Sequence, residues 1–493
     1  MDAPPAPIPT PAAAPSPTAF QIFRRRREPP APLATPHVLL IRGCPRSGTT
    51  LIAAMINASP DGAVIYEYSL DALVRDLRVL LAYDEETGRR FALAPEGFEL
   101  TDVESETAYF NDFGDPPYEH YPTEQRFGAI VTAVVEATVG KRDVKIIGSK
   151  TPGSVVADGR AALSPYFSDI RYLFMVRNPL DTINSMMNRR NLTQIGADEW
   201  EITDIDGAIA EYRQNVLALM SHVADDPAAC YVVKFEDLVA RSADVVARLE
   251  HFLGIPLHDT RRLVQPQTET RIILTAEERA RVDAAFGDAI ASWPEKHLIG
   301  TGDDAVGELA EFVEKLTPGV RYRYGAPDST RRFLGAAWNV LEEGGVWSGS
   351  TDADLFFTVE KSGEYVISVE LSCILVGPQS SKSVAVELNG ATLFRGTAIA
   401  TEAPIIDVTS GDTELFPAPG PRTVLCGPVA LEAGRVNRLV LRTDDARSPK
   451  ALGVSEDPRS LGVYLHGLLV SKAAEKRTTN GTPSQWKVHR RTP

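Results

Sequence analysis

Short apolar runs alternate with longer amphipathic stretches through the first two thirds of the chain. The amphipathic stretches, of which 206–223 and 240–253 are the clearest, have the three-to-four-residue spacing of helices. Strands separated by helices are typical of a mostly parallel sheet with helices on both faces. We therefore predict an α/β domain over residues 36–325. Its expected strands are Val38–Ile41, Val144–Ile147, Tyr172–Val176 and Tyr231–Phe235.

The pattern changes after Gly325 to an alternation with a period of two, which is typical of half-buried strands. The alternation is clear in 364–370 and 384–388. Asn389-Gly390 separates 384–388 from the next apolar run and is a strong signal for a two-residue hairpin turn. We therefore predict a separate antiparallel β-sandwich over residues 330–472.

Both ends of the chain lack these patterns. Residues 1–35 are rich in proline and alanine, which cannot bury a core, so we expect a disordered tail. Residues 473–493 are polar and are expected to form a flexible tail. The basic group Arg24–Arg27 is interpreted as a solvated arm, with a membrane-surface or targeting patch as the alternative.

Charge and composition narrow the classes of partner. The chain of 493 residues carries a net charge of −15, so a nucleic-acid surface is not expected and any anion site must be local. No stretch approaches the roughly 18 apolar residues of a spanning helix, and no signal-peptide layout is present. The four cysteines form no C-x-x-C pair, which favours a reducing compartment. We expect a cytoplasmic protein, with attachment to the inner membrane face as the alternative.

The segment after the first expected strand reads Gly43-Cys44-Pro45-Arg46-Ser47-Gly48-Thr49-Thr50. Its glycine spacing is that of the nucleotide-triphosphatase P-loop, but Thr49 stands in the position of the lysine. A strand, a glycine-bearing loop and a helix N-terminus together form an anion site. Arg46 adds a fixed positive charge, and Ser47, Thr49 and Thr50 add hydroxyl donors. The segment indicates a phosphate-linked donor other than a hydrolysed nucleoside triphosphate.

A second strand-to-helix junction carries Arg177 at the strand end and Ser185 on the following helix. An arginine and a hydroxyl that converge there make a second phosphate clamp. Phosphoryl-transfer enzymes often carry a magnesium-handling aspartate at a late strand end, and none is evident in the sequence. We expect a donor with two phosphate-bearing positions and no metal site.

These motifs, in this order, resemble those of the sulfotransferases that use 3′-phosphoadenosine 5′-phosphosulfate. The resemblance covers residues 37–300 and implies a P-loop-like α/β fold. It implies that Arg177 and Ser185 bind the 3′-phosphate of the donor. The first loop is similar to that of protein-tyrosine sulfotransferases and many bacterial sulfotransferases. In such a loop the 5′-phosphosulfate would be held by Pro45, Arg46, Ser47, Gly48, Thr49 and Thr50.

The resemblance also implies the reacting groups. Glu67 falls where the family's catalytic glutamate lies and would accept the proton of the acceptor hydroxyl. Lys150, within 148–152, resembles the lysine of the family's Lys-x-Pro element and would contact the leaving oxygen together with Arg46. Without the resemblance, Glu67 is interpreted as a surface glutamate and Lys150 as an exposed loop lysine.

The leading hypothesis is an enzyme that transfers a sulfuryl group to a hydroxyl of a saccharide, within a surface polysaccharide or glycolipid. The β-rich module faintly resembles sandwiches appended to bacterial cell-surface polysaccharide enzymes. Its Trp338 and Trp347 are interpreted as core residues, with a sugar platform as the alternative. A protein-tyrosine or small-molecule acceptor is the nearest alternative. A P-loop kinase-like phosphotransferase and an inactive binding scaffold are the further ones.

Overall fold

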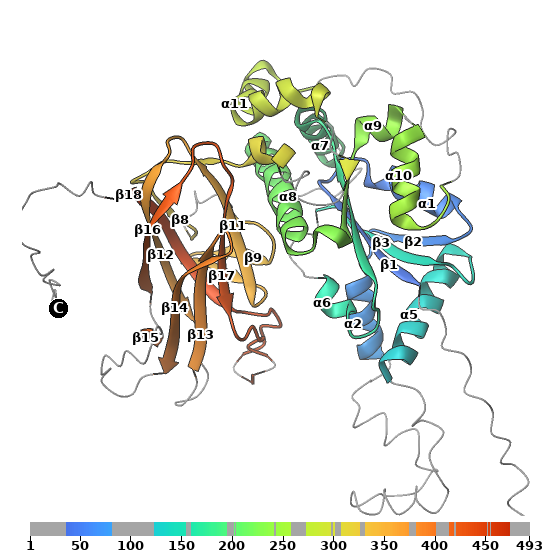
Figure 1. The fold of residues 1–493 in the computed structure, drawn as a ribbon. Coiled ribbons are helices and arrows are strands. Elements are labelled where there is room, and N and C mark those ends of the chain that lie inside the picture. The colour runs from blue at the N-terminus through green and yellow to red at the C-terminus, as the bar shows by residue number, and fades with distance from the viewer. Residues whose placement is uncertain are drawn as a thin grey trace, which may run out of the picture.

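The fold is given by a computed structural model, which describes most of the chain between residues 36 and 473. The described residues are 36–80, 123–153, 159–194, 202, 204–240, 243–257, 273–296, 299–300, 307–325, 331–373, 381–400, 414–418, 421–450, 452–453 and 455–473. Apart from Ala473, the expected tails 1–35 and 473–493 lie outside these residues, as does Arg24–Arg27. Figure 1 shows two bodies, one made of helices around a sheet and the other made of strands.

A six-stranded sheet forms the centre of the first body, with the strand order β2-β3-β1-β4-β5-β6. The pairs among β1 to β5 are parallel, and β6 is antiparallel to β5. The predicted parallel sheet is confirmed, and β3 extends further than expected, so that Lys150 ends the strand. The bounds are β1 His37–Gly43, β2 Gly62–Tyr66, β3 Ile146–Lys150, β4 Ile170–Val176, β5 Cys230–Lys234 and β6 Ile299–Gly300.

Helices cover both faces of this sheet, as the α/β prediction requires (Figure 1). Alternate residues of β1 point to opposite layers: Leu39 and Ile41 join one core, and Val38 and Leu40 join the other. The first layer contains α1 Thr49–Ala58, α9 Phe235–Ala240 and α10 Ala243–Leu253. The second contains α2 Leu70–Leu80, α5 Thr123–Val139, α6 Gly159–Leu163, α7 Pro179–Gln194, α8 Ile205–Asp225 and α11 Ala276–Ser292.

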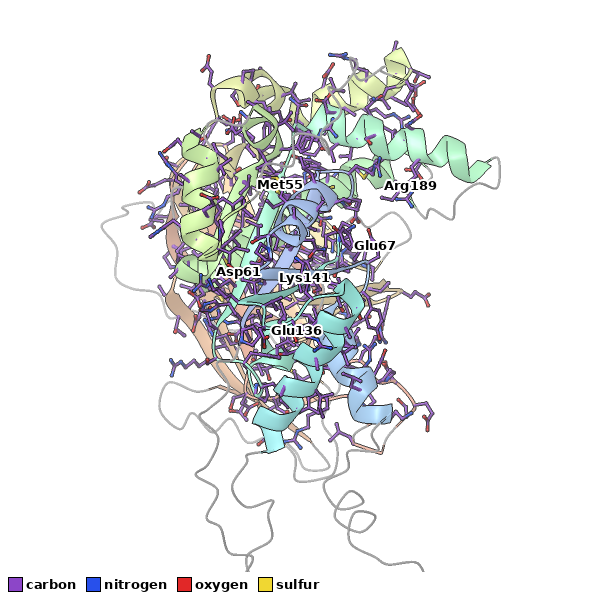
Figure 2. The ribbon with its side chains drawn as sticks, turned by 90° about the vertical axis from the view of Figure 1, so that its right-hand side faces the viewer. Met55, Asp61, Glu67, Glu136, Lys141 and Arg189 are labelled. Carbon is purple, nitrogen blue, oxygen red and sulfur yellow. The ribbon has the colours of Figure 1, made fainter. Side chains whose placement is uncertain are left out.

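The layer around α1 is tied to the sheet by a lysine. Figure 2 labels Lys141, which follows α5, together with Met55 of α1. The Lys141 ammonium donates to the carbonyl oxygens of Asn57, Ser59 and Gly62 at 2.6, 2.5 and 2.5 Å. These carbonyls surround the carboxyl end of α1, where a cation is favoured by the helix dipole. Lys141 thus fixes α1, the helix that follows the loop after β1.

Two further sheets form the second body, which is the predicted β-sandwich. One has the order β16-β12-β18-β10-β9, with β8 on β18, and the other has the order β15-β14-β13-β17-β11-β7. Their inward side chains share one core. Most pairs are antiparallel, but β15 is parallel to β14 and β7 is parallel to β11. The bounds are β7 Lys315–Leu316, β8 Arg321–Arg323, β9 Trp338–Glu342, β10 Gly345–Ser348, β11 Asp352–Val359, β12 Gly363–Cys373, β13 Ser381–Leu388, β14 Ala391–Ala400, β15 Glu414–Ala418, β16 Arg422–Leu431, β17 Asn437–Thr443 and β18 Val463–Lys472.

The hairpin turn and the buried tryptophans of the sandwich agree with the sequence-based predictions. Asn389 and Gly390 connect β13 to β14 with φ angles of 51° and 84°, the positive values that a type I′ hairpin turn needs. Trp338 and Trp347 are 0% and 8% exposed. Both tryptophans are therefore core residues, and neither offers a ring face for stacking against a sugar.

The strands β7 and β8 lie within residues 36–325, yet they pair with β11 and β18 of the sandwich. In contrast, Leu309 and Phe312 pack in the core of the α/β body. The domain limits 36–325 and 330–472 remain a prediction. We propose that the chain passes from one body to the other near Lys315.

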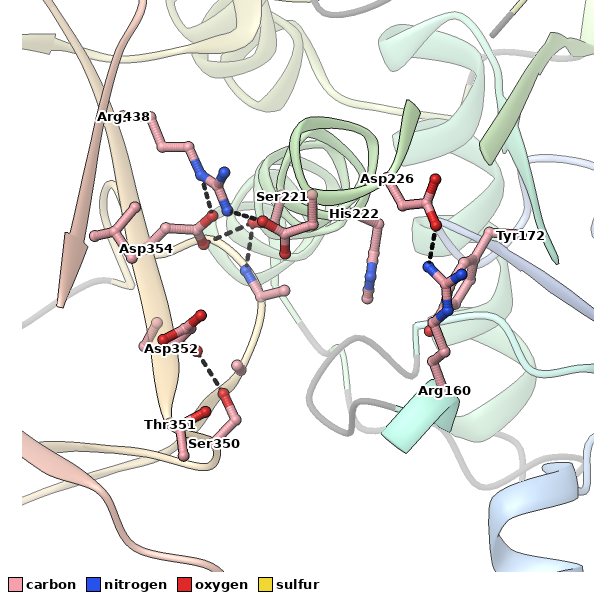
Figure 3. Close-up of a pocket in the computed structure, with 15 residues that line it drawn as sticks. Arg160, Tyr172, Ser221, His222, Asp226, Ser350, Thr351, Asp352, Asp354 and Arg438 are labelled. Atoms are coloured by element: carbon pink, nitrogen blue, oxygen red, sulfur yellow. Dashed lines mark hydrogen bonds and ion pairs between the residues drawn. The ribbon is translucent and has the colours of Figure 1, made fainter. Parts of the chain in front are cut away.

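The two bodies meet where the end of α8 reaches β11 and β17. Figure 3 shows Asp354 between Ser221 and Arg438. The Ser221 hydroxyl donates to one Asp354 carboxylate oxygen at 2.7 Å, and Arg438 Nε donates to the other at 2.8 Å. Arg438 also pairs with Asp225 at the end of α8. These groups line a cavity of about 180 Å³ between the bodies.

Candidate functional site

The loop between β1 and α1 has a backbone that depends on two glycines. Gly43 and Gly48 have φ angles of 150° and 100°. A Cβ atom on Gly43 would lie 2.5 Å from the carbonyl oxygen of Met175, and one on Gly48 would lie 2.3 Å from the Phe235 ring. Only glycine fits such contacts. The sequence thus folds here into a tight cradle pressed against β4 and α9.

Polar groups of the loop point to an anion. Gly48 is the N-cap of α1 and provides no side-chain cap, which leaves the helix N-terminus open to a ligand. Ser47 is fully buried, and its hydroxyl has no hydrogen-bond partner. A buried hydroxyl of this kind is costly unless a ligand satisfies it. Arg46 and Thr50 are exposed, whereas Pro45 and Thr49 are buried.

Cys44, in the same loop, is excluded as a nucleophile. Its thiol is buried, and this burial raises its pKa well above the ordinary value, with a smaller contribution from Glu211. The reactive form of cysteine is the thiolate. At neutral pH Cys44 therefore remains a protonated packing residue.

The second junction lies directly beside the first. Arg46 Nε donates to the Ser185 hydroxyl at 3.1 Å, across 139 positions of sequence. Arg177, at the end of β4, donates from Nη1 to the Arg46 carbonyl oxygen at 3.3 Å. Arg177 is 7% exposed, and its Nε has no hydrogen-bond partner. The two predicted clamps thus form one continuous basic surface.

Neighbouring side chains hold Arg177 in place. Its guanidinium lies over the Phe235 ring, 4.8 Å from the centroid. The buried Tyr212 of α8 donates to the Arg177 carbonyl oxygen at 2.7 Å. The next residue, Asn178, donates its backbone N–H to the Glu236 carboxylate at 3.0 Å. Burial raises the pKa of Glu236, although the hydrogen bond from the Asn178 amide opposes the shift.

Glu67 and Lys150 meet at the ends of adjacent strands. Tyr66 and Lys150 are paired in register on β2 and β3, and the Glu67 amide donates to the Lys150 carbonyl oxygen at 2.9 Å. Their side chains form an ion pair in which Lys150 is 3% exposed and Glu67 is 65% exposed. Glu67 has a φ angle of 56°, unusual for a residue other than glycine. The carboxylate is thus presented at the surface above a buried ammonium.

All ten predicted site residues lie at one edge of the sheet. This edge holds the carboxyl ends of the parallel strands, where ligands bind in open α/β sheets. The first loop follows β1, Glu67 follows β2, Lys150 ends β3, and Arg177 follows β4. Ser185 reaches the same place from α7. The arrangement can bind an anion with two separated charged groups beside a carboxylate and an ammonium.

Arg42 is a site residue that the sequence analysis missed. It is 6% exposed on β1, and its Nη1 donates to the Thr151 hydroxyl at 3.2 Å, next to Lys150. Its Nη2 lies 3.8 Å from Asp71 in the first turn of α2, four residues after Glu67. Burial lowers the pKa of Arg42, and Asp71 opposes this shift. The feature of the sequence that could have pointed to Arg42 is a charged residue at the end of an otherwise apolar strand.

No group of three or more metal-binding side chains occurs within the described ranges. No helix in that same portion of the chain is long and apolar enough to cross a membrane.

Solved structures of low identity align with the chain. A sulfotransferase domain from the Synechococcus olefin synthase is 18% identical, covering 57% of this chain and 97% of its own, with a TM-score of 0.28. A Mycobacterium avium sulfotransferase is 18% identical, covering 55% and 79%, with a TM-score of 0.31. A CBM35 from Paenibacillus barcinonensis is 13% identical, covering 31% and 100%, with a TM-score of 0.16. No curated protein matches the chain.

The family comparison covers the α/β body. The model described as the sulfotransferase family matches residues 37–259. This segment starts at β1 and includes both clamps, Glu67 and Lys150. The resemblance of the motifs is thereby confirmed. Residues 37–259 of the α/β body are thus similar to the sulfotransferase family.

Proposed function

We propose that the chain transfers a sulfuryl group from 3′-phosphoadenosine 5′-phosphosulfate to an acceptor hydroxyl. The observation that carries this proposal is the 3.1 Å hydrogen bond between Arg46 and Ser185. It joins the loop after β1 to the helix after β4, so one nucleotide with two charged ends can contact both. A donor with a single phosphate group would not need the second clamp.

The polar groups present fit such a donor. The open N-terminus of α1 favours the negative charge of the phosphosulfate oxygens. The unpartnered Ser47 hydroxyl and Arg177 Nε are donors without acceptors. In this proposal Ser47 meets the 5′-phosphosulfate and Arg177 meets the 3′-phosphate, which satisfies both groups.

The proposed reaction is an in-line displacement at sulfur. Glu67 takes the proton of the acceptor hydroxyl while the acceptor oxygen bonds to sulfur. The bond between sulfur and the bridging phosphate oxygen breaks, and that oxygen keeps the electron pair. Lys150, Arg46 and the amides of the first loop stabilise the resulting charge. The Lys150–Glu67 ion pair must open for this step, so that each group can take its own part.

We propose a saccharide of a surface polysaccharide or glycolipid as the acceptor, modified on the cytoplasmic side. The support is the sandwich appended to the α/β domain and the exposed position of Glu67, which is open to a large acceptor. Tyrosyl peptides and small phenols are the competing acceptors. No metal takes part in the proposed step.

The test is incubation of the full chain with sulfur-labelled donor and three pools of acceptors: oligosaccharides, tyrosyl peptides and phenols. Transfer to the oligosaccharide pool is expected. Transfer only to peptides or phenols would overturn the acceptor class. Binding of the donor without transfer to any pool would indicate a scaffold, and phosphoryl transfer from magnesium ATP would refute the sulfuryl reaction.

A further inference from the structure

Two exposed tyrosines flank the proposed base. Among the described residues, the large hydrophobic side chains that remain well exposed include two aromatic ones, Tyr66 and Tyr68, at 41% each. Both are immediate neighbours of Glu67 in sequence. Aromatic rings are normally buried, and exposed ones close together often mark a binding surface. Their position suggests contact with the molecule that Glu67 deprotonates.

Contacts on one side orient the Tyr66 ring. The Lys150 ammonium lies 5.7 Å from its centroid, and Asn57 Nδ2 donates to its hydroxyl at 3.4 Å. Tyr66 ends β2, which holds its backbone in the sheet. The ring is thus fixed beside the reacting groups while much of its surface faces solvent.

Charged groups surround the Tyr68 hydroxyl. It donates to the Asp76 carboxylate, and Arg75 Nε donates to the other oxygen of that carboxylate at 3.0 Å. The hydrogen bond from Tyr68, followed by that from Arg75, lowers the pKa of Asp76. The side chains of Arg75 and Asp76 are 69% and 43% exposed. The hydroxyl end of the Tyr68 ring therefore contacts a solvent-exposed ion pair between Asp76 and Arg75.

We propose that Tyr66, Tyr68, Arg75 and Asp76 form an acceptor strip that binds a saccharide. This inference rests on the proposed function, in which Glu67 is the base. Pyranose rings have an apolar C–H face that packs on tyrosine and hydroxyls that bond to charged groups.

The charged end of the strip favours a sugar over a phenol. Asp76 and Arg75 offer an acceptor and several donors for hydroxyls outside the reacting one, and a simple phenol has no such hydroxyls.

The experiment uses the full chain saturated with adenosine 3′,5′-bisphosphate. Cellobiose, lactose, α-1,2-mannobiose and p-cresol are the probes, and saturation-transfer NMR measures their affinities. We expect at least one disaccharide to bind, with saturation of its ring protons, and Tyr66→Ala and Tyr68→Ala to weaken it at least tenfold. Tyr68→Phe should keep the ring contact, and Asp76→Asn should weaken binding a few-fold. Leu425→Ala, at an exposed side chain of the sandwich, is the matched control.

The outcomes separate this inference from the proposed function. Calorimetric titration of the nucleotide tests the donor site independently, and failure of nucleotide binding would contradict the proposed function itself. If the nucleotide binds but no disaccharide binds the wild-type chain, the acceptor strip is refuted. It is equally refuted if only p-cresol binds, or if both tyrosine-to-alanine variants bind the disaccharide as tightly as the Leu425→Ala control.

Discussion

Glu67 and Lys150 form an ion pair across the ends of two adjacent parallel strands. The ammonium is buried and the carboxylate is exposed, so the pair has one fixed and one accessible member. In the proposed reaction the two groups act on opposite sides of the transferred sulfur. In that proposal the ion pair holds the Glu67 carboxylate beside the buried ammonium until the substrates separate the two groups.

Glu67→Gln removes the proposed base and keeps the shape of the side chain. We expect sulfuryl transfer to fall at least a hundredfold, because general base catalysis contributes about 10²–10⁴ in rate. Affinity for adenosine 3′,5′-bisphosphate should change little, since the nucleotide is held by the clamps. Transfer at the wild-type rate would eliminate Glu67 as the base.

Arg177→Ala should weaken binding of adenosine 3′,5′-bisphosphate about tenfold or more. The lost interaction is a charge-assisted hydrogen bond to the 3′-phosphate, worth about 1.5–3 kcal/mol. Arg171→Ala is the control, because Arg171 lies at the other end of β4 and pairs with Asp169. Equal losses of affinity in both variants, measured by calorimetry, would contradict a specific role for Arg177.

Gly48→Ala should unfold at lower temperature than the wild-type chain and bind the nucleotide poorly. The alanine would have an unfavourable positive φ and a clash with the Phe235 ring. Gly140→Ala tests the unfavourable positive φ without a clash, because Gly140 has a φ angle of 75° and open space around its Cβ position. We expect about 1 kcal/mol of destabilisation for Gly140→Ala and a further 1–3 kcal/mol for Gly48→Ala. Equal melting temperatures of the two variants would argue against the cradle geometry.

Lys141→Met should destabilise the α/β domain by about 2–3 kcal/mol, because three carbonyl oxygens at the end of α1 lose a charged donor. Burial already lowers the pKa of Lys141, which shows that the ammonium is partly desolvated. Lys145→Met should lower the free energy of unfolding by less than about 1 kcal/mol, since Lys145 is 62% exposed and forms a surface ion pair with Asp61. Denaturant unfolding of both variants tests this difference, and similar midpoints would disprove it.

Asp354 should make stability depend on pH. Burial raises its pKa to about 6, against the opposing effect of Arg438, from an unfolded value of about 3.8. The folded state therefore binds the proton more tightly, and the stabilisation from protonation is lost as pH rises from about 4 through 6. Across this pH range the contribution of Asp354 to the free energy of unfolding changes by about 3 kcal/mol. Asp354→Asn should flatten the pH dependence of thermal unfolding between pH 4 and 7, and parallel profiles would contradict the assignment.

The sequence was most informative where backbone pattern and chemistry coincide. The strand before Gly43 and the strand before Arg177 were both predicted, because apolar runs followed by glycine or proline identify strand ends. The contact between Arg46 and Ser185 agrees with two clamps that hold one donor, because the carboxyl ends of parallel strands share one edge of a sheet. The Asn389-Gly390 turn followed from the dihedral angles that only a few residues accept.

Contacts between distant side chains were not predictable in the same way. Nothing in the local pattern around Tyr212 indicates that its hydroxyl meets the carbonyl of Arg177, because the periodicity of a helix identifies a buried face but no partner. The contact between Arg42 and Thr151 was not predictable for the same reason. The two-residue strand β7 was missed because short edge strands have too few residues to show alternation.

The helix α8 makes the sandwich hard to remove. The Tyr212 hydroxyl donates to the Arg177 carbonyl oxygen. Ser221, nine positions later on the same helix, hydrogen-bonds to Asp354 and to the Ala336 amide of the other body. Phe356 of β11 packs into the core of the α/β body. A truncated protein ending at residue 325 would therefore expose a ready-made apolar and polar seam to water. A protein prepared for study of the α/β body should therefore extend through β18. A shorter protein would need polar side chains in place of the apolar ones that the sandwich covers.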